Sequence, residues 1–190
     1  MQILCTIEGI APLLMNRFHE AAQQKASAGT SSTMAGKKGS PRDQAEPKVY
    51  VGANGKPVLP GTNFNAAVVE AGKFIKSGKS KLTTTRSSLV PAGLSILEVE
   101  APITPSKWEV DSRAVVIPST GGRILCHRPR FDEWRVTFTL EVDESMFDES
   151  IVRELVDLAG QRIGLGDFRP QRRGSFGRFK VVSWRKSSHG

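Results

Sequence analysis

The chain lacks several features that define large classes of protein. It contains no run approaching the ~18 apolar residues that a membrane-spanning helix needs. Its two cysteines, Cys5 and Cys126, form no metal-ligand spacing, and both lie in strand-like segments, so we expect buried thiols in a reducing compartment. The first residues carry no basic leader, and Glu8 follows a short apolar stretch, so no signal peptide is expected. The prediction is a cytoplasmic protein without a membrane partner.

The sequence motifs of common enzyme classes are also missing. The chain has no Walker phosphate-binding loop, no HExxH zinc motif, no cluster of metal-ligating side chains and no Ser-His-Asp pattern. It contains three histidines, which leaves little material for general acid–base chemistry. We therefore expect a binding protein that has no catalytic residue, no metal and no cofactor.

What the chain has in excess is positive charge, and this charge is concentrated in blocks. Its 27 lysines and arginines against 19 acids give a formal charge of +8 and a pI near 9.8. Residues 161–190 hold eight basic residues and one acid, Asp167, while residues 73–86 hold five basic residues and no acid. Residues 98–157 carry thirteen acids. Such segregation predicts one basic face, which is typical of proteins that bind nucleic acids.

Residues 164–178 form a segment in which glycines and arginines are interspersed, here called the glycine–arginine loop. Glycine lets backbone amides approach a ligand closely, and guanidinium groups bind phosphate in a planar, bidentate geometry. Phe168, Phe176 and Phe179 lie among these arginines, as in base-stacking platforms. We expect Phe179 in the core, which leaves Phe176 as the stacking candidate. The loop is predicted to bind a sugar–phosphate strand.

Hydrophobic periodicity predicts an α+β fold. Alternating apolar residues predict strands at 2–9, 94–99, 134–142 and 178–184. The first of two amphipathic helices is expected to begin at a Thr62 or Asn63 cap and to bury Phe74, and the second to begin at Asp148. Smaller hairpins are expected at 49–60, turning at Asn54-Gly55, and at 106–130. This order is β-α-β-β-α-β, the ferredoxin-like arrangement of RNA-recognition modules, with one sheet face left free for a ligand.

These elements define a single domain over residues 1–190 with one insertion and one tail. Residues 20–48 consist mainly of small and polar residues, which predicts a flexible segment that either folds onto a polyanion or serves as a linker. The segment 106–130 is expected to project as a hairpin, and residues 186–190 to form a tail.

Three segments resemble the repeat-associated mysterious protein (RAMP) superfamily. Residues 55–67 resemble the segment P-x-[IL]-P-G-[ST]-S-[LF]-[KR]-G that leads into the first helix of that domain. Residues 163–181 resemble its glycine-rich loop and final strand, and residues 7–14 resemble its first strand and turn. Asn65 stands where the family usually has a basic residue, and Ala66 stands where it usually has glycine.

The resemblance extends to the backbone subunits of CRISPR effector complexes, which polymerise along a guide RNA. It implies a ferredoxin-like palm, contacts of Gly61, Thr62 and Asn63 with the nucleic-acid backbone, and head-to-tail self-association along the strand. The chain is short for a full backbone subunit, which favours a small or virus-encoded relative. Because some superfamily members cleave RNA without metal through a histidine, a ribonuclease that uses His127 or His19 is one alternative.

Together these inferences predict a protein that binds single-stranded nucleic acid, RNA in preference to DNA. A phage-type single-strand DNA binding or annealing protein is the other alternative, because it needs the same basic groove. The glycine–arginine loop, the helix start at residues 60–63 and the basic block at residues 73–86 are expected to form one continuous groove. The predicted contacts are Arg17, Gly61, Thr62, Asn63, Asn65, Lys73, Lys79, Lys81, Arg86, His127, Arg128, Arg169, Arg172, Arg173, Gly174, Phe176, Gly177 and Arg178.

Overall fold

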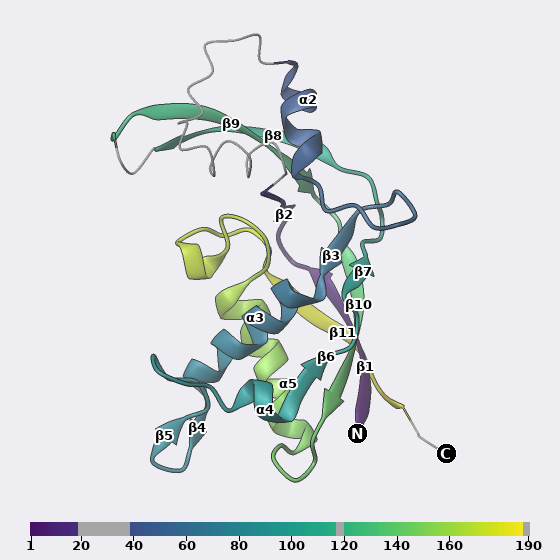
Figure 1. Cartoon of the computed structure of the whole chain (residues 1–190), viewed down its shortest axis with the longest axis vertical. Coiled ribbons are helices and arrows are strands. Elements are labelled where there is room, and N and C mark those ends of the chain that lie inside the picture. The colour runs from purple at the N-terminus through teal and green to yellow at the C-terminus, as the bar shows by residue number, and fades with distance from the viewer. Residues whose placement is uncertain (19–38, 117–119, 188–190) are drawn as a thin grey trace.

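The computed structural model describes residues 1–18, 39–116 and 120–187 (Figure 1). Its architecture is mixed α+β and is built on antiparallel sheets. Among the helices in these residues, none combines the length and the apolar character needed to cross a membrane.

The main sheet has four strands, in the order β11-β1-β10-β6, and all neighbouring strands are antiparallel. These strands are β1 (Gln2–Gly9), β6 (Leu94–Ile96), β10 (Arg135–Val142) and β11 (Phe179–Ser187). Alternation in the sequence sets which side chains point inward: Ile3, Cys5 and Ile7 of β1 are fully buried. Burial raises the pKa of the Cys5 thiol to about 12, so this cysteine is a core residue as expected.

Two helices pack on the inward face of this sheet, and each lies between two of its strands in the chain (Figure 1). Helix α3 (Gly61–Ala71) connects β1 to β6, and α5 (Glu149–Leu158) connects β10 to β11. Phe64 of α3 stacks on Phe138 of β10, with ring centroids 4.4 Å apart and planes 5° from parallel. This pair fixes α3 across the middle of the sheet.

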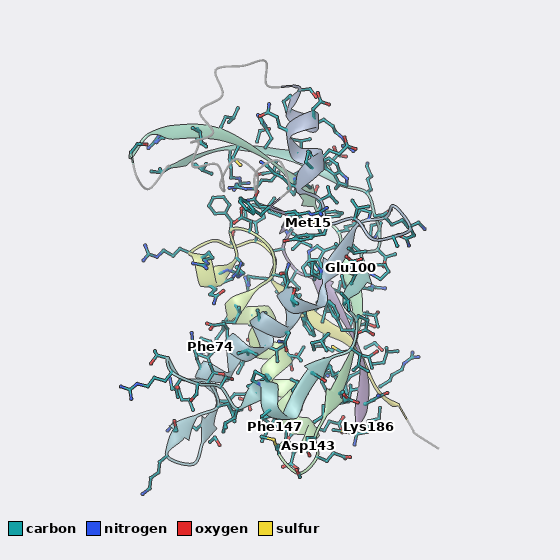
Figure 2. The ribbon with its side chains drawn as sticks, in the orientation of Figure 1. Met15, Phe74, Glu100, Asp143, Phe147 and Lys186 are labelled. Carbon is teal, nitrogen blue, oxygen red and sulfur yellow. The ribbon has the colours of Figure 1, made fainter. Side chains whose placement is uncertain are left out.

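The predicted start of α3 is wrong, because no side chain caps it. The N-cap residue is Pro60, whose fixed φ suits the entry to a helix, and α3 already begins at Gly61. A β-carbon on Gly61 would clash with the carbonyl oxygen of Glu98, so glycine is needed for this close packing. The helix ends in a 3-10 turn, η2 (Gly72–Phe74), and Phe74 is 43% exposed instead of buried (Figure 2).

Helix α5 ends in a wider turn than the sequence suggests. Its last residues continue as a π-helical segment, η3 (Ala159–Ile163), which leads directly into the glycine–arginine loop at Gly164. Gly160 packs against the backbone of Phe179, where a β-carbon would clash with the carbonyl oxygen. A short 3-10 turn, η4 (Pro170–Arg172), lies within the loop. The π-helical segment packs against both α3 and β11.

A second sheet forms one end of the elongated molecule (Figure 1). It consists of β2 (Leu13–Leu14), β9 (Arg123–Phe131) and β8 (Glu109–Val116), in the order β2-β9-β8. The predicted hairpin over 106–130 is therefore confirmed for its described residues. It is joined to the main body through β2, which directly follows β1.

The prediction of a flexible segment over residues 20–48 is wrong for its last part, and residues 19–38 lie outside the described residues. Helix α2 (Pro41–Ala45) and η1 (Glu46–Lys48) pack on β9. Ser40 and Asp43 form a reciprocal capping box, with Asp43 N–H donating to Ser40 Oγ over 3.2 Å. The Arg42 guanidinium lies 3.7 Å from the centre of the Trp108 ring, which attaches α2 to the start of the hairpin.

The smaller elements complete the chain. They are β3 (Val58–Pro60), β4 (Lys76–Ser77), β5 (Ser80–Lys81), α4 (Val90–Gly93) and β7 (Glu100–Pro102). The turn predicted at Asn54-Gly55 is confirmed, with Gly55 at φ +75°. The strand predicted over 94–99 is shorter than expected, because it ends at Ile96 and Val99 is 81% exposed. Hairpin β4–β5 lies at the end of the molecule opposite to β8–β9 (Figure 1).

Candidate nucleic-acid interface

The glycine–arginine loop and helix α3 enclose a cavity of about 450 Å³, here called the loop–helix cavity. Its wall from α3 carries Asn63, Ala66, Ala67 and Glu70, which follow one face of the helix. Its other walls are formed by Met15, Asn16, Tyr50, Leu59, residues 163–167, Arg169 and Gln171. The two segments that the sequence singled out, the start of α3 and the glycine-rich loop, therefore lie side by side.

Inside the loop, the glycines contact the protein's own backbone. A β-carbon on Gly174 would clash with the carbonyl oxygen of Phe168, and one on Gly177 would clash with that of Leu165. Gly177 is buried and adopts φ +67°, a conformation that favours glycine. The expectation that Gly174 and Gly177 leave the backbone open to a ligand is therefore wrong. They pack the loop backbone closely, and their N–H groups donate to the carbonyl oxygens of Arg169 and Pro12.

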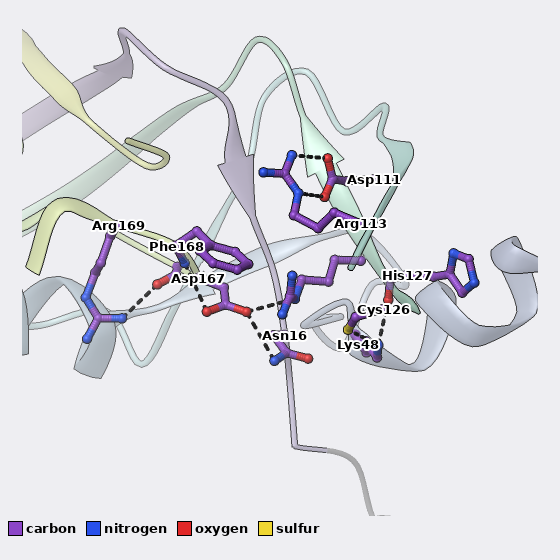
Figure 3. Close-up of polar contacts among 11 residues, drawn as sticks. Asn16, Lys48, Asp111, Arg113, Cys126, His127, Asp167, Phe168 and Arg169 are labelled. Atoms are coloured by element: carbon purple, nitrogen blue, oxygen red, sulfur yellow. Dashed lines mark hydrogen bonds and ion pairs between the residues drawn. The ribbon is translucent and has the colours of Figure 1, made fainter. Parts of the chain in front are cut away.

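Asp167 attaches this loop to the second sheet (Figure 3). Its carboxylate forms an ion pair with Arg128 Nε at 2.8 Å and accepts a hydrogen bond from Asn16 Nδ2 at 3.2 Å. Its backbone N–H donates to the carbonyl oxygen of Leu14 over 2.8 Å. Because Asp167 is the only acid in the loop, its pairing leaves the loop's exposed arginines without an acidic partner from the loop itself.

Arg128, a predicted contact, is an anchoring residue and not an exposed one. It is 5% exposed, and its guanidinium lies 4.7 Å from the centre of the Phe168 ring. Its Nη1 atom has no hydrogen-bond partner within the described part of the chain. A buried guanidinium needs a counter-charge, so Asp167 and Arg128 hold the hairpin and the loop in one arrangement.

Arg113 of β8 is a residue that sequence reasoning missed. Its guanidinium is held by Asp111, with Nε donating to Oδ2 over 2.6 Å, and it lies 4.6 Å from the centre of the Phe176 ring. Phe176, the predicted stacking residue, is half-buried, so Arg113 covers one of its faces. The contact joins residues distant in the sequence, and no local pattern in β8 marks Arg113 as a partner of the loop.

Three arginines of the loop are exposed and have no ion pair with another described residue: Arg172, Arg173 and Arg178. Arg173 adopts φ +63° just after η4, at the turn of the loop. Arg169 differs from them, because its Nη1 donates to the carbonyl oxygen of Gly166 over 2.7 Å. Burial, together with the nearby Arg172, lowers the pKa of Arg169 from its ordinary value.

The predicted residues on α3 and on η2, which follows it, differ in their relation to the cavity. Asn63 lines the loop–helix cavity. Lys73 of η2 does not line it, but its Nζ donates to Oε2 of the lining residue Glu70 over 2.6 Å. Gln171 of the loop donates to the same oxygen over 2.9 Å, which connects the loop to the helix. Thr62 is exposed, but Gly61 is buried against Glu98, and neither residue lines the cavity; nor does the half-buried Asn65.

The remaining basic candidates are not among the residues that line the cavity. Lys79, Lys81 and Arg86 are exposed in or after hairpin β4–β5, beyond the C-terminal end of α3. Arg17 is exposed near η1, and its backbone N–H donates to the carbonyl oxygen of Lys48 over 3.0 Å. In Figure 1 the hairpin β4–β5 and the glycine–arginine loop lie along the same side of the molecule.

His127 is 7% exposed, and its Nδ1 forms a hydrogen bond with Ser112 Oγ at 2.6 Å. Its carbonyl oxygen accepts a hydrogen bond from Lys48 Nζ at 2.6 Å, and the same ammonium contacts Cys126 Sγ at 3.4 Å (Figure 3). The expectation that Cys126 is buried is wrong, because it is partly exposed. His19 lies outside the described residues.

The outward face of the main sheet has a different character. Its outward positions on β1, β10 and β11 carry aliphatic, hydroxyl, amide and charged side chains and no aromatic one, within the described residues. Glu8 pairs with both Arg135 and Lys180 on this face. Their N–H groups, those of Arg135 foremost, lower the pKa of Glu8.

Among the described residues, no group of three histidine, cysteine or acidic side chains is arranged to hold a metal ion. In comparisons with known proteins, no family model and no curated protein matches the chain.

Proposed function

We propose that this protein is a ferredoxin-like, RAMP-like cytoplasmic protein that binds single-stranded nucleic acid, RNA in preference to DNA. The observation that carries the proposal is the group of three exposed arginines, Arg172, Arg173 and Arg178, unpaired within the described residues. They project from a loop whose only acid is already paired to Arg128. Because these guanidiniums have no acidic partner among the described residues, binding a phosphate would not require them to break an ion pair there.

The connectivity of the main sheet supports the ferredoxin-like assignment. Numbered within this sheet, the strand order β11-β1-β10-β6 is 4-1-3-2 with antiparallel neighbours, and each helix connects two strands that are not adjacent. The location of the glycine-rich loop after α5 and before the last strand supports the RAMP resemblance in turn.

The composition of the two faces supports binding on the loop side. RNA-recognition modules stack bases on aromatic side chains of the open sheet face. Here that face has no aromatic side chain at its described outward positions, and its Glu8 is paired with two cations. We therefore favour the loop side as the binding surface over the open sheet face that the sequence predicted. On the loop side, Phe168 and Phe176 lie beside arginines.

A gel-shift and competition series tests the proposal. Labelled single-stranded RNA is titrated with protein and then competed with unlabelled RNA or DNA of the same sequence. We expect binding that weakens steeply with salt and is displaced more effectively by RNA. Preferential displacement by DNA would support the single-strand DNA binding alternative, and no shift at low salt with either strand would refute the proposal.

The same series, run with strands of increasing length, tests self-association along the strand, which the RAMP resemblance adds to this proposal. Head-to-tail assembly predicts stepwise shifts, one for each added protomer, whereas independent binding of one protein predicts a single shifted species on short strands. Rods in negative-stain images of the longest complexes would support assembly.

A further inference from the structure

We infer that the loop–helix cavity holds one unstacked nucleobase that carries an exocyclic amino group, while the strand's phosphates contact the arginines outside. This inference rests on the proposed function, and it assigns a ligand to a cavity that the arginine cluster alone does not explain.

The charge distribution separates the cavity from the arginine cluster. Two carboxylates, Glu70 and Asp167, and one guanidinium, Arg169, line the cavity, and Arg169 already donates to Gly166 and Gln171. The lining therefore carries more negative than positive charge, which disfavours a phosphate in the interior. The exposed guanidiniums of Arg172 and Arg173 are not among its lining residues. A strand that contacts those arginines therefore places its neutral part, the base, toward the cavity.

The inner walls suit the flat faces of an aromatic ring. Met15, Leu59 and Leu165 are each about 1% exposed and line the cavity with apolar atoms. On the helix side, Ala66 and Ala67 occupy consecutive positions between two polar residues, Asn63 and Glu70, and their small side chains leave the space open. A volume of about 450 Å³ lies within the range of small-ligand sites and accommodates a base with part of its sugar.

The polar groups suit the edge of a base that donates hydrogen bonds. The Glu70 Oε2 atom accepts from Lys73 and Gln171, which leaves Oε1 without a hydrogen bond to another described residue. The Asn63 side chain, half-buried at the start of α3, likewise makes no hydrogen bond within the described residues. Carboxylate oxygens accept from the amino groups of guanine, cytosine and adenine, and guanine adds a neighbouring ring N–H. Uracil offers a single ring N–H and no amino group.

The test uses uridine-only RNA strands that carry, at one central position, a guanosine, a uridine or an abasic site. We expect the guanosine strand to bind roughly ten-fold more tightly than the abasic strand, a size typical of one well-held base. The affinity of the uridine strand should exceed that of the abasic strand by much less than ten-fold. A strand with a central 2-aminopurine, which has an exocyclic amino group, should change its fluorescence on binding as this base leaves its neighbours.

Two cavity variants and a matched control assign the effect. Ala66→Phe fills the cavity from an exposed helix position, and Asn63→Ala removes one polar group without adding bulk. Ala92→Phe adds the same ring at an exposed position of α4 outside the cavity. Both cavity variants should lose the ten-fold preference and keep the affinity for the abasic strand, whereas Ala92→Phe should retain both.

The outcomes separate this inference from the function on which it rests. Equal binding of the guanosine and abasic strands by the native protein, or a preference that survives Ala66→Phe, overturns the base site and leaves strand binding intact. A second outcome is that no strand binds, but free guanosine binds to the native protein and not to Ala66→Phe. In that case the base site stands and strand binding is refuted. Failure of both strands and guanosine to bind overturns both proposals.

Discussion

Both sides of the main sheet carry basic side chains, but the two sides differ in how these side chains are paired with acids. On the outward face, Glu8 pairs with both Arg135 and Lys180, and of the outward basic side chains there only the exposed Arg185 has no ion pair among the described residues. On the loop side, the one acid of the loop is used to anchor Arg128, and the exposed arginines are left without a partner among the described residues. The comparison teaches that net charge alone does not locate a binding surface; the unpaired part of it does.

The largest expected effect is on the free energy of unfolding, when the close backbone packing of the glycine–arginine loop is disrupted. In Gly177→Ala the new β-carbon clashes with the carbonyl oxygen of Leu165 and the residue keeps φ +67°, so the free energy of unfolding should fall by roughly 3 kcal/mol. Gly55→Ala is the matched control, because φ is +75° there but nothing lies within 4 Å of the added carbon. It should lose only about 1 kcal/mol. Urea denaturation measures both, and equal losses would contradict the clash.

The next effect tests the unpaired charges directly. Arg172→Ala combined with Arg173→Ala should shallow the slope of log K against log salt by about 1.4 and weaken all sequences alike, roughly 25-fold at about 0.1 M salt. Arg135→Ala combined with Lys180→Ala removes the same charge from the outward face and should leave the slope unchanged. Similar losses in the two double variants would show that net charge, and not its location, governs binding.

A smaller effect is expected where the loop joins the second sheet. Asp167→Asn removes the counter-charge of the buried Arg128 and should lower the free energy of unfolding by roughly 1–3 kcal/mol. The control is Glu109→Gln, which breaks the solvent-exposed pair with Lys107 and should cost less than about 0.5 kcal/mol. Thermal or urea unfolding of both variants provides the measurement. If Asp167→Asn is as mild as the control, the anchoring role of Asp167 is wrong.

The smallest effect concerns the compensated charges of the outward face. Because the pKa of Glu8 is lowered from its ordinary value of 4.5 in the folded protein, its ionised form stabilises the fold. That contribution is fully present above pH 4.5 and is lost as the pH falls through the lowered folded value. Glu8→Gln should therefore be slightly less stable than the native protein near neutral pH, and the difference should close on acidification. A constant difference across a pH series of melting curves would contradict this assignment.

Local sequence patterns were sufficient to predict the strands and helices whose apolar residues recur with a regular period. Alternation located β1 and β10, and the apolar stripe located α3 and its buried residues Phe64 and Val68. Helix α2 was missed because it has few apolar residues, although Ser40 and Asp43 have the spacing of a capping box. Ser40 and Asp43 lie three residues apart with Pro41 between them, and this spacing was the signal that could have predicted the start of α2.

The candidate site was predictable in outline and not in detail. The sequence placed the start of α3 and the glycine-rich loop in one site, and both adjoin the loop–helix cavity. It did not reveal that Gly174 and Gly177 pack against Phe168 and Leu165 of their own loop, because that contact depends on how the loop folds back on itself. Nor did it reveal that Arg113 covers Phe176, because these two residues are far apart in the sequence. Of the two carboxylates of the cavity, Glu70 lies outside any motif, and Asp167 lies within the loop but was not predicted to line a cavity.

The unequal burial of the two thiols has a practical consequence. Cys5 is fully buried and its pKa is raised to about 12, so it contributes almost no reactive thiolate, whereas Cys126 is partly exposed on β9. A maleimide fluorophore or spin label should attach at Cys126 alone, without prior mutagenesis. Because β9 also holds Arg128, such a reporter would sense movements of the hairpin relative to the loop while a strand is being bound.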